Sequence, residues 1–141
     1  MARIKNSLGG IPVSRAMQTN FQSLSPQDTL ARAVELILSG SQHDFPVVAD
    51  GRVIGVLERD TFIKALAKAG TNEPVVDVMR RSVPEVDTHE MIESALTRLE
   101  QSGAKTLPVT HAGQLAGLIT AENITEFLMI RSALRAAPTA S

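Results

Sequence analysis

The sequence has no cysteine, tryptophan or tyrosine, and only four of its 141 residues are phenylalanine. Without cysteine there can be no disulfide bond, no thiolate metal site and no cysteine nucleophile. Because aromatic residues are scarce, a core must be built mainly from Val, Ile, Leu, Ala and Met. No feature marks the chain as secreted, so a reducing cytoplasm is the expected location.

Long apolar runs and an excess of one charge are also missing. The apolar runs, such as Val56-Leu57, fall far below the roughly 20 residues that cross a bilayer, so we expect no membrane span. The 14 basic and 15 acidic residues nearly cancel, which argues against broad binding to nucleic acid. With 43% apolar residues, a chain of this length can bury the core of one ordinary domain.

Motifs that carry catalysis are not visible either. The sequence shows no Gly-rich P-loop, no nucleophile elbow, no His-Glu-x-x-His and no paired-carboxylate site, so we do not expect an enzyme. His43 next to Asp44 is more typical of a surface turn than of acid-base chemistry. His89 and His111 show no metal-ligand spacing with each other or with His43, so no metal site is predicted.

The strongest signal is an internal repeat. At an offset of 62 residues and without a gap, identical residues align along the chain. They include the pairs Val13/Val75, Met17/Met79, Pro46/Pro108, Gly55/Gly117 and Leu66/Leu128. Such a repeat predicts two similar units that pack around a pseudo-twofold axis, each covering the apolar face of the other. The expected divisions are an N-terminal linker at 1–12, repeat 1 at 13–70, repeat 2 at 75–136 and a flexible tail at 137–141.

Each unit is predicted to follow the order β-α-β-β-α, which gives an α/β (α+β) fold with small sheets packed against helices. A short extended piece precedes a helix, whose start is marked by Ser25-Pro26 in the first unit and by a capping box at 87–90 in the second. Ser39-Gly40-Ser41 and Ser102-Gly103 are expected to end these helices. Two hairpins follow, each leading into a second helix; the expected ranges are 45–48 with 52–57 and then 59–68, and 107–110 with 114–119 and then 121–134.

The sequence resembles the cystathionine-β-synthase (CBS) domain, which occurs in tandem pairs. The resemblance lies in this order of elements, in the apolar-Pro-Val strand and in the turn from Gly117 to Asn123. The resemblance covers residues 13–134. Segments 30–36, 41–48 and 123–129 are similar in more detail to the CBS pair appended to site-2-protease-like membrane zinc metallopeptidases. That similarity implies the cytoplasmic regulatory part of a larger enzyme, or a free relative of it.

The resemblance implies an adenosine-type ligand in the cleft between the repeats, with its ribose on a Thr/Ser-x-x-Asp/Asn turn. Thr120 and Asn123 match that turn, and Gly117 before it allows a close approach of backbone. Amides at a helix start, with hydroxyl and amide side chains nearby, suit a sugar and its phosphate. The alternative is that Thr120 and Asn123 only cap the helix. The opposite wall is expected to come from Phe21, Gln22, Gln42 and His43.

The equivalent site in the other repeat departs from the motif, because Glu58 and Thr61 replace the expected residues. Glu58 would repel a phosphate. Lys105, beside Thr106 on the facing wall, is expected to neutralise Glu58 in part, to meet a phosphate of the ligand, or to be a solvated surface lysine. Asp44 is expected to face the better site and to disfavour a triphosphate. The ligand predicted is therefore an adenine nucleotide with few phosphates, or the cationic S-adenosylmethionine, and no cofactor is required.

Two functions remain open at this point. The first is a regulatory module that senses an adenosine ligand and controls an attached or partner protein. The second is a ligand-free dimerisation module of a membrane metalloprotease-type protein. The apolar stripe 127–130 suits a homodimer formed through the CBS helices, or else belongs to the core of the chain itself.

Overall fold

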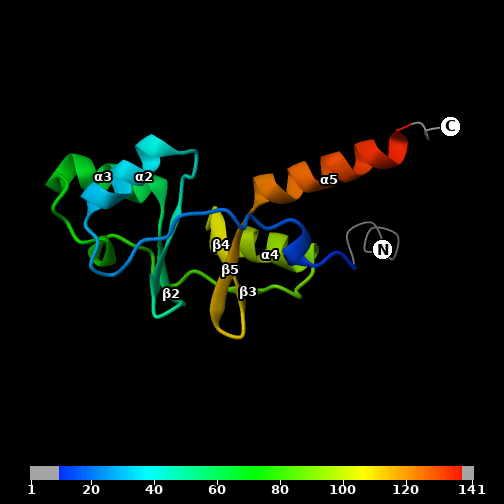
Figure 1. The fold of residues 1–141 in the computed structure, drawn as a ribbon, viewed down its shortest axis with the longest axis horizontal. Helices are drawn as coiled ribbons and strands as arrows, with labels where there is room; N and C mark the ends of the chain where they lie inside the picture. The colour runs from blue at the N-terminus through cyan, green and yellow to red at the C-terminus, as the bar shows by residue number, and fades with distance from the viewer. Residues whose placement is uncertain (1–9, 138–141) are drawn as a thin grey trace.

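The computed structural model describes residues 10–137. Residues 1–9 and 138–141, which hold most of the expected linker and tail, lie outside the described residues. Within residues 10–137, four α-helices and two small sheets form two units that lie side by side (Figure 1), in agreement with the predicted α+β fold. In chain order the elements are the 3-10 helix η1 (Val13–Arg15), α2 (Leu30–Ser39), β1 (Phe45–Ala49), β2 (Arg52–Leu57), α3 (Arg59–Ala69), the 3-10 helix η2 (Val75–Asp77), β3 (Val86–Asp87), α4 (Ile92–Ser102), β4 (Thr106–His111), β5 (Gln114–Thr120) and α5 (Ala121–Ala136).

The second unit has the predicted order β-α-β-β-α, from β3 to α5. In the first unit, a single β-bridge between Leu24 and Val47, of parallel type, takes the place of the initial strand. The sheet of this unit consists of β1 and β2. The matching pair one repeat later, Val86 and Val109, lies in the regular pairing of β3 with β4. Both hairpins also carry a register shift at the same repeat position, after Val47 and after Val109. The two units therefore share one plan in detail.

The predicted start of α2 was wrong. The helix begins at Leu30 rather than at Pro26, because residues 25–28 form a separate turn in which the Ser25 amide donates to the Asp28 carboxylate (2.7 Å). The Leu30 amide then donates to the carbonyl of Glu73 (2.9 Å). A segment from elsewhere in the chain thus uses backbone groups that a longer helix would need.

The start of α4 was wrong for the same reason. The capping-box contact forms, since the Asp87 amide donates to the Glu90 carboxylate (3.2 Å), but it closes a turn, and the helix begins only at Ile92. The Ile92 amide donates to the carbonyl of Ile11 (3.0 Å). The ends of both helices, at Ser39 and Ser102, and both hairpins with their following helices are confirmed.

The segments that precede the two units are exchanged between them. Val13, in η1, is fully buried in the core of the second unit, while Val75, in η2, is fully buried in the core of the first. Gln18 bridges to Leu118, and Arg80 bridges to Val56 at the equivalent position. Each unit is thus completed by the segment that precedes the other unit in the chain. This is the reciprocal arrangement expected of a pseudo-twofold pair.

The last helix, α5, extends away from both units along its C-terminal half (Figure 1). Ile124 near its start is buried in the second core, whereas Met129, Ile130 and Leu134 are exposed, at 66%, 55% and 72% of their surface. Within residues 10–137, none of the helices has the length and apolar character needed to span a membrane.

Candidate functional site

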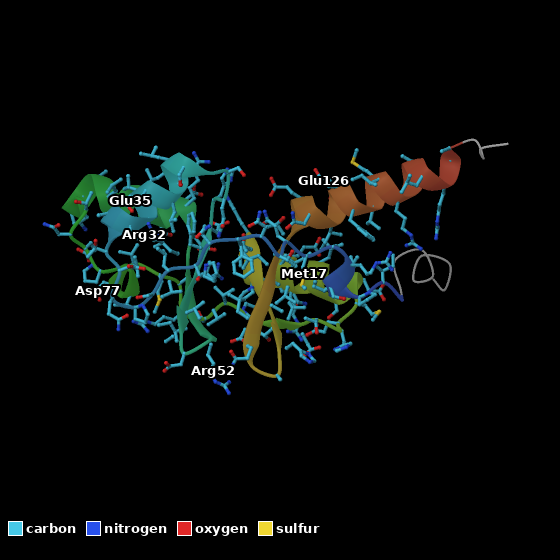
Figure 2. All side chains as sticks on the ribbon, viewed as in Figure 1. Met17, Arg32, Glu35, Arg52, Asp77 and Glu126 are labelled. Atoms are coloured by element: carbon cyan, nitrogen blue, oxygen red, sulfur yellow. The ribbon has the colours of Figure 1, made fainter. Side chains whose placement is uncertain are left out.

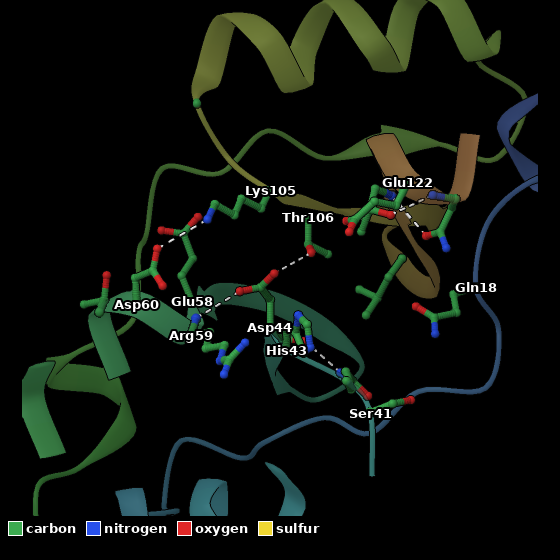
Figure 3. Close-up of a pocket in the computed structure, with 16 residues that line it drawn as sticks. Gln18, Ser41, His43, Asp44, Glu58, Arg59, Asp60, Lys105, Thr106 and Glu122 are labelled. Atoms are coloured by element: carbon green, nitrogen blue, oxygen red, sulfur yellow. Dashed lines mark hydrogen bonds and ion pairs between the residues drawn. The ribbon is translucent and has the colours of Figure 1, made fainter. Parts of the chain in front are cut away.

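A polar cleft of about 590 Å³ lies where the two units meet. Figure 3 shows that side chains reach it from the segments that lead into β1 and β4, from the second hairpin, and from the starts of α3 and α5. The volume lies in the range of small-molecule sites. Its lining residues are Gln18, Ser41, Gln42, His43, Asp44, Glu58, Arg59, Asp60, Thr61, Gly103, Lys105, Thr106, Leu118, Thr120, Glu122 and Asn123.

Thr120 and Asn123 line the cleft and also cap α5. The Asn123 amide donates to the Thr120 hydroxyl oxygen (2.9 Å), and the Thr120 amide donates to the Asn123 side-chain oxygen (3.1 Å). The same geometry is therefore compatible with both interpretations of this pair, as ligand-binding residues and as a helix cap. The cap uses one acceptor on each side chain, so the Thr120 hydroxyl proton and the Asn123 NH₂ group remain chemically able to donate to a ligand.

Asp44 forms the floor of the cleft between the two units. Its carboxylate is buried (7% exposed) and accepts from the Arg59 amide (3.0 Å) and from the Thr106 hydroxyl (2.8 Å), as the dashed lines of Figure 3 show. Asp44 and Thr106 occupy equivalent positions of the two repeats, so this contact sits on the pseudo-twofold axis. The carboxylate also lies at the N-terminus of α3, where a negative charge is favourable.

Of the alternatives for Lys105, the pairing with Glu58 is not present. Glu58 instead pairs with Arg80 (3.3 Å), whose guanidinium also donates to the Ser102 carbonyl. Lys105 pairs with Asp60 (3.3 Å), and both of those side chains are largely exposed. The half-buried Arg80 thus neutralises Glu58. Thr61, the repeat counterpart of Asn123, is exposed at the cleft beside them.

Phe21 and Gln22 do not line this cleft. They belong to an adjoining cavity of about 420 Å³, which shares Gln18, Ser41 and Gln42 with the first. The Gln42 side chain is anchored there, since it donates to the carbonyls of Gln22 (2.9 Å) and Asp44 (2.8 Å) and accepts from the Gln22 amide (2.7 Å). Gln42 therefore lies between the cleft and the second cavity, whose lining includes Phe21 and Phe45.

Gly117 does not line either cavity, and its role differs from the one expected. A Cβ atom built on Gly117 would lie 2.7 Å from the Met17 sulfur and 2.9 Å from the Gln18 carbonyl oxygen. The glycine accommodates the N-terminal segment of the chain itself, which passes close to β5. Met17 is labelled in Figure 2 where it lies against the second unit.

Sequence reasoning missed several residues that reach the cleft: Gln18, Ser41, Arg59, Asp60 and Glu122. It also missed Arg80, the ion partner of Glu58. The repeat contained a usable signal, because Gln18 and Arg80 are equivalent positions that bridge to equivalent strands. His43, which was predicted, is exposed at the edge of the cleft. Asp87, His89 and His111 lie together elsewhere on the surface, although no spacing in the sequence predicted it.

The family model of the CBS domain matches the chain twice, over residues 9–68 and 75–130. The chain is 28% identical over 128 residues to the protein MJ1225 of Methanocaldococcus jannaschii, a match that covers 88% of this chain and 46% of that protein. It is 25% identical over 122 residues to homoserine O-acetyltransferase of Methanococcus vannielii, covering 84% of this chain and 25% of that enzyme. The chain therefore spans at most about half the length of these two relatives.

Solved structures share the fold. A crystal structure of CBSX2 in complex with AMP is 26% identical with a TM-score of 0.72, and the match covers 89% of this chain and 98% of that one. A crystal structure of the CBS-pair protein CBSX2 from Arabidopsis thaliana gives a TM-score of 0.77 at 22% identity, covering 91% and 99%. Because the family model covers most of both units, this chain belongs to the CBS domain family, as a tandem pair of CBS domains.

Proposed function

We propose that the chain is a regulatory, non-catalytic module that binds an adenosine-containing ligand in the cleft between its two CBS domains. The observation that carries the proposal is the polar cleft at the junction of the units, with Thr120 and Asn123 on its wall. A relative that is 26% identical over most of both chains has been solved in complex with AMP. Because the ligand would touch both units, its binding would shift their relative packing, and a partner domain could sense that shift.

The proposed orientation follows from the two adjoining cavities. The ribose would accept from Asn123 and Thr120 at the start of α5, and the adenine base would extend past Gln18 and Gln42 toward the ring of Phe21. An apolar ring beside a polar cleft is the combination that an aromatic base with a sugar requires. Phe21 and Gln22 thereby keep a ligand role, in the second cavity rather than the first.

The charged side chains that line the cleft favour some adenosine ligands over others. Four carboxylates line the cleft, from Asp44, Glu58, Asp60 and Glu122, against the cations of Arg59 and Lys105. Each phosphate added to the ligand brings more negative charge into this environment. We therefore propose AMP or the cationic S-adenosylmethionine as the ligand rather than ATP. A cytoplasmic location and the control of an attached or partner protein belong to the same proposal.

Replacing Asn123 with alanine is expected to weaken the binding of AMP at least about tenfold, because a hydrogen bond to the ligand disappears and its partner is left unsatisfied. The measurement is isothermal titration calorimetry of the nucleotide-stripped chain against AMP, ADP, ATP and S-adenosylmethionine. Parent chain should bind about one ligand, and ATP more weakly than AMP.

Two variants separate ligand contact from helix capping. Asn123→Asp keeps the side-chain oxygen that accepts from the Thr120 amide, but it removes the NH₂ donor and adds a negative charge, so it should keep the stability of the parent and weaken the binding of AMP. Thr61→Ala changes the exposed equivalent position in the other repeat and should leave affinity unchanged. A folded Asn123→Ala variant that binds AMP as tightly as the parent would refute the site, and a folded parent that binds none of the four ligands would refute the sensing function.

The exposed apolar side chains of α5 favour a second role, as a homodimer formed through the CBS helices. Phe127 and Leu128 pack against the second core, so they belong to the molecule itself, whereas Met129, Ile130 and Leu134 project into solvent. A second copy of the chain, with its own α5, would cover such a surface symmetrically. Attachment to a membrane metallopeptidase stays a prediction that rests on the sequence resemblance.

Replacing Met129 with glutamate is expected to convert the dimer into a monomer, because it places a charge in the centre of the proposed apolar contact. Size-exclusion chromatography with light scattering measures the change. Thr97→Glu adds the same charge at an exposed position of α4 and should leave the dimer intact. A parent chain that is monomeric at all accessible concentrations would contradict the homodimer.

A further inference from the structure

One surface cluster lies outside the cleft and is not explained by the proposed function. Asp87 ends β3, His89 follows in the turn before α4, and His111 ends β4. The two strands run parallel with Asp87 opposite Thr110, so the next residue of β4, His111, is brought beside the turn. The turn is fixed to β4 by the Thr88 amide, which donates to the Thr110 carbonyl (3.0 Å).

The three side chains face one another closely. His89 Nδ1 lies 3.1 Å from an Asp87 carboxylate oxygen, and the Thr88 hydroxyl lies 3.3 Å from His111 Nδ1 and 3.4 Å from His89 Nδ1. The two imidazole rings are 5.5 Å apart, centre to centre. One ligand atom from each of Asp87, His89 and His111 falls within 4.8 Å of the others. Small side-chain rotations would bring them to the roughly 2 Å metal–ligand distances of a zinc site.

We propose that Asp87, His89 and His111 form a binding site for a divalent transition-metal ion such as Zn²⁺, with water completing its coordination. Two imidazoles and a carboxylate suit Zn²⁺ and similar ions, whereas Mg²⁺ and Ca²⁺ prefer oxygen ligands alone.

The other repeat shows that folding alone does not require these side chains. The equivalent turn has the same hydrogen bonds, with the Ser25 amide on the Asp28 carboxylate (2.7 Å) and the Gln27 amide on the Ser25 hydroxyl (3.2 Å). The repeat counterparts of Asp87, His89 and His111 are Ser25, Gln27 and Ala49. The turn therefore forms without histidine or aspartate at these positions, and only the second unit carries the metal-binding set.

The test is calorimetric titration of the chelator-treated full chain with zinc chloride, in a buffer that does not bind metals and at a pH where histidine is neutral. We expect saturable binding of one ion per chain, and no binding of magnesium chloride. His89→Ala and His111→Ala should each weaken zinc binding more than about tenfold, since even the loss of groups that only orient metal ligands costs 10–100-fold. All three positions are exposed, so the variants should fold like the parent.

His43→Ala is the matched control, because His43 is the one histidine of the sequence outside the proposed site and lies at the cleft. It should bind zinc as the parent does. The proposal is overturned if the parent shows no saturable binding, if zinc binding survives both His89→Ala and His111→Ala, or if His43→Ala abolishes it. AMP binding measured on His89→Ala and His111→Ala should be unchanged, because neither residue lines the cleft, which keeps this result separate from that of the cleft.

Discussion

Replacing Gly117 with valine is expected to destabilise the protein by about 3 kcal/mol, which for a domain of this size lowers the melting temperature by roughly 10 °C. The added Cβ would lie 2.9 Å from the Gln18 carbonyl oxygen, a backbone atom that cannot rotate away as the Met17 side chain can. Gln18 and Leu118 exchange two hydrogen bonds, at 2.7 and 2.9 Å, so displacing the segment breaks both.

The displaced segment also carries Val13, which is fully buried in the second core. Because Gln18 lines both cavities, AMP affinity should fall together with stability. Gly40→Ala is the matched control, since Gly40 has extended backbone (φ −151°) and the nearest atom to an added Cβ is 3.7 Å away; it should change stability by less than about 0.5 kcal/mol. Equal thermal unfolding of the two variants would contradict the proposed role of Gly117.

The fold could be predicted where the same sequence pattern occurs in both repeats. The self-similarity at an offset of 62 residues predicted two units of the same order, each with a hairpin, and the structure confirms both hairpins. Where prediction failed, a distant segment decided the outcome. Ser25 and Asp87 have the local chemistry of helix caps, but residues 73–75 and 11–13 pair with the backbone just after each turn and delay the helix. Local patterns cannot reveal a partner that is close only in three dimensions.

The site residues were likewise predictable where their contacts are local in the sequence. Thr120 and Asn123 were recognisable because their reciprocal contact is local, three residues apart. The ion pair of Glu58 with Arg80 joins positions 22 residues apart, and the approach of His111 to Asp87 depends on the register of two parallel strands. Neither contact leaves a spacing signature in the sequence. The sequence therefore left open whether Lys105 neutralises Glu58 or is a solvated surface lysine; it is exposed and pairs with Asp60.

Replacing Asp44 with alanine is expected to cost about 3 kcal/mol of folding stability. The substitution leaves the buried Thr106 hydroxyl and the part-buried Arg59 amide without their acceptor, and a buried unsatisfied group costs about 1–3 kcal/mol. The N-terminus of α3 also loses a favourable negative charge. Chemical denaturation, with the slope compared between variants, measures the effect.

Asp60→Ala is the matched control, because Asp60 lines the same cleft but is exposed and paired only with an exposed lysine; its loss should cost less than about 1 kcal/mol. A double-mutant cycle with Thr106→Val isolates the contact on the pseudo-twofold axis and should give a coupling energy of about 1–3 kcal/mol. A coupling energy near zero would mean that Asp44 stabilises the protein only through its contacts with the start of α3. A large coupling would mean that one hydrogen bond between equivalent positions holds the two CBS domains in the register that forms the cleft.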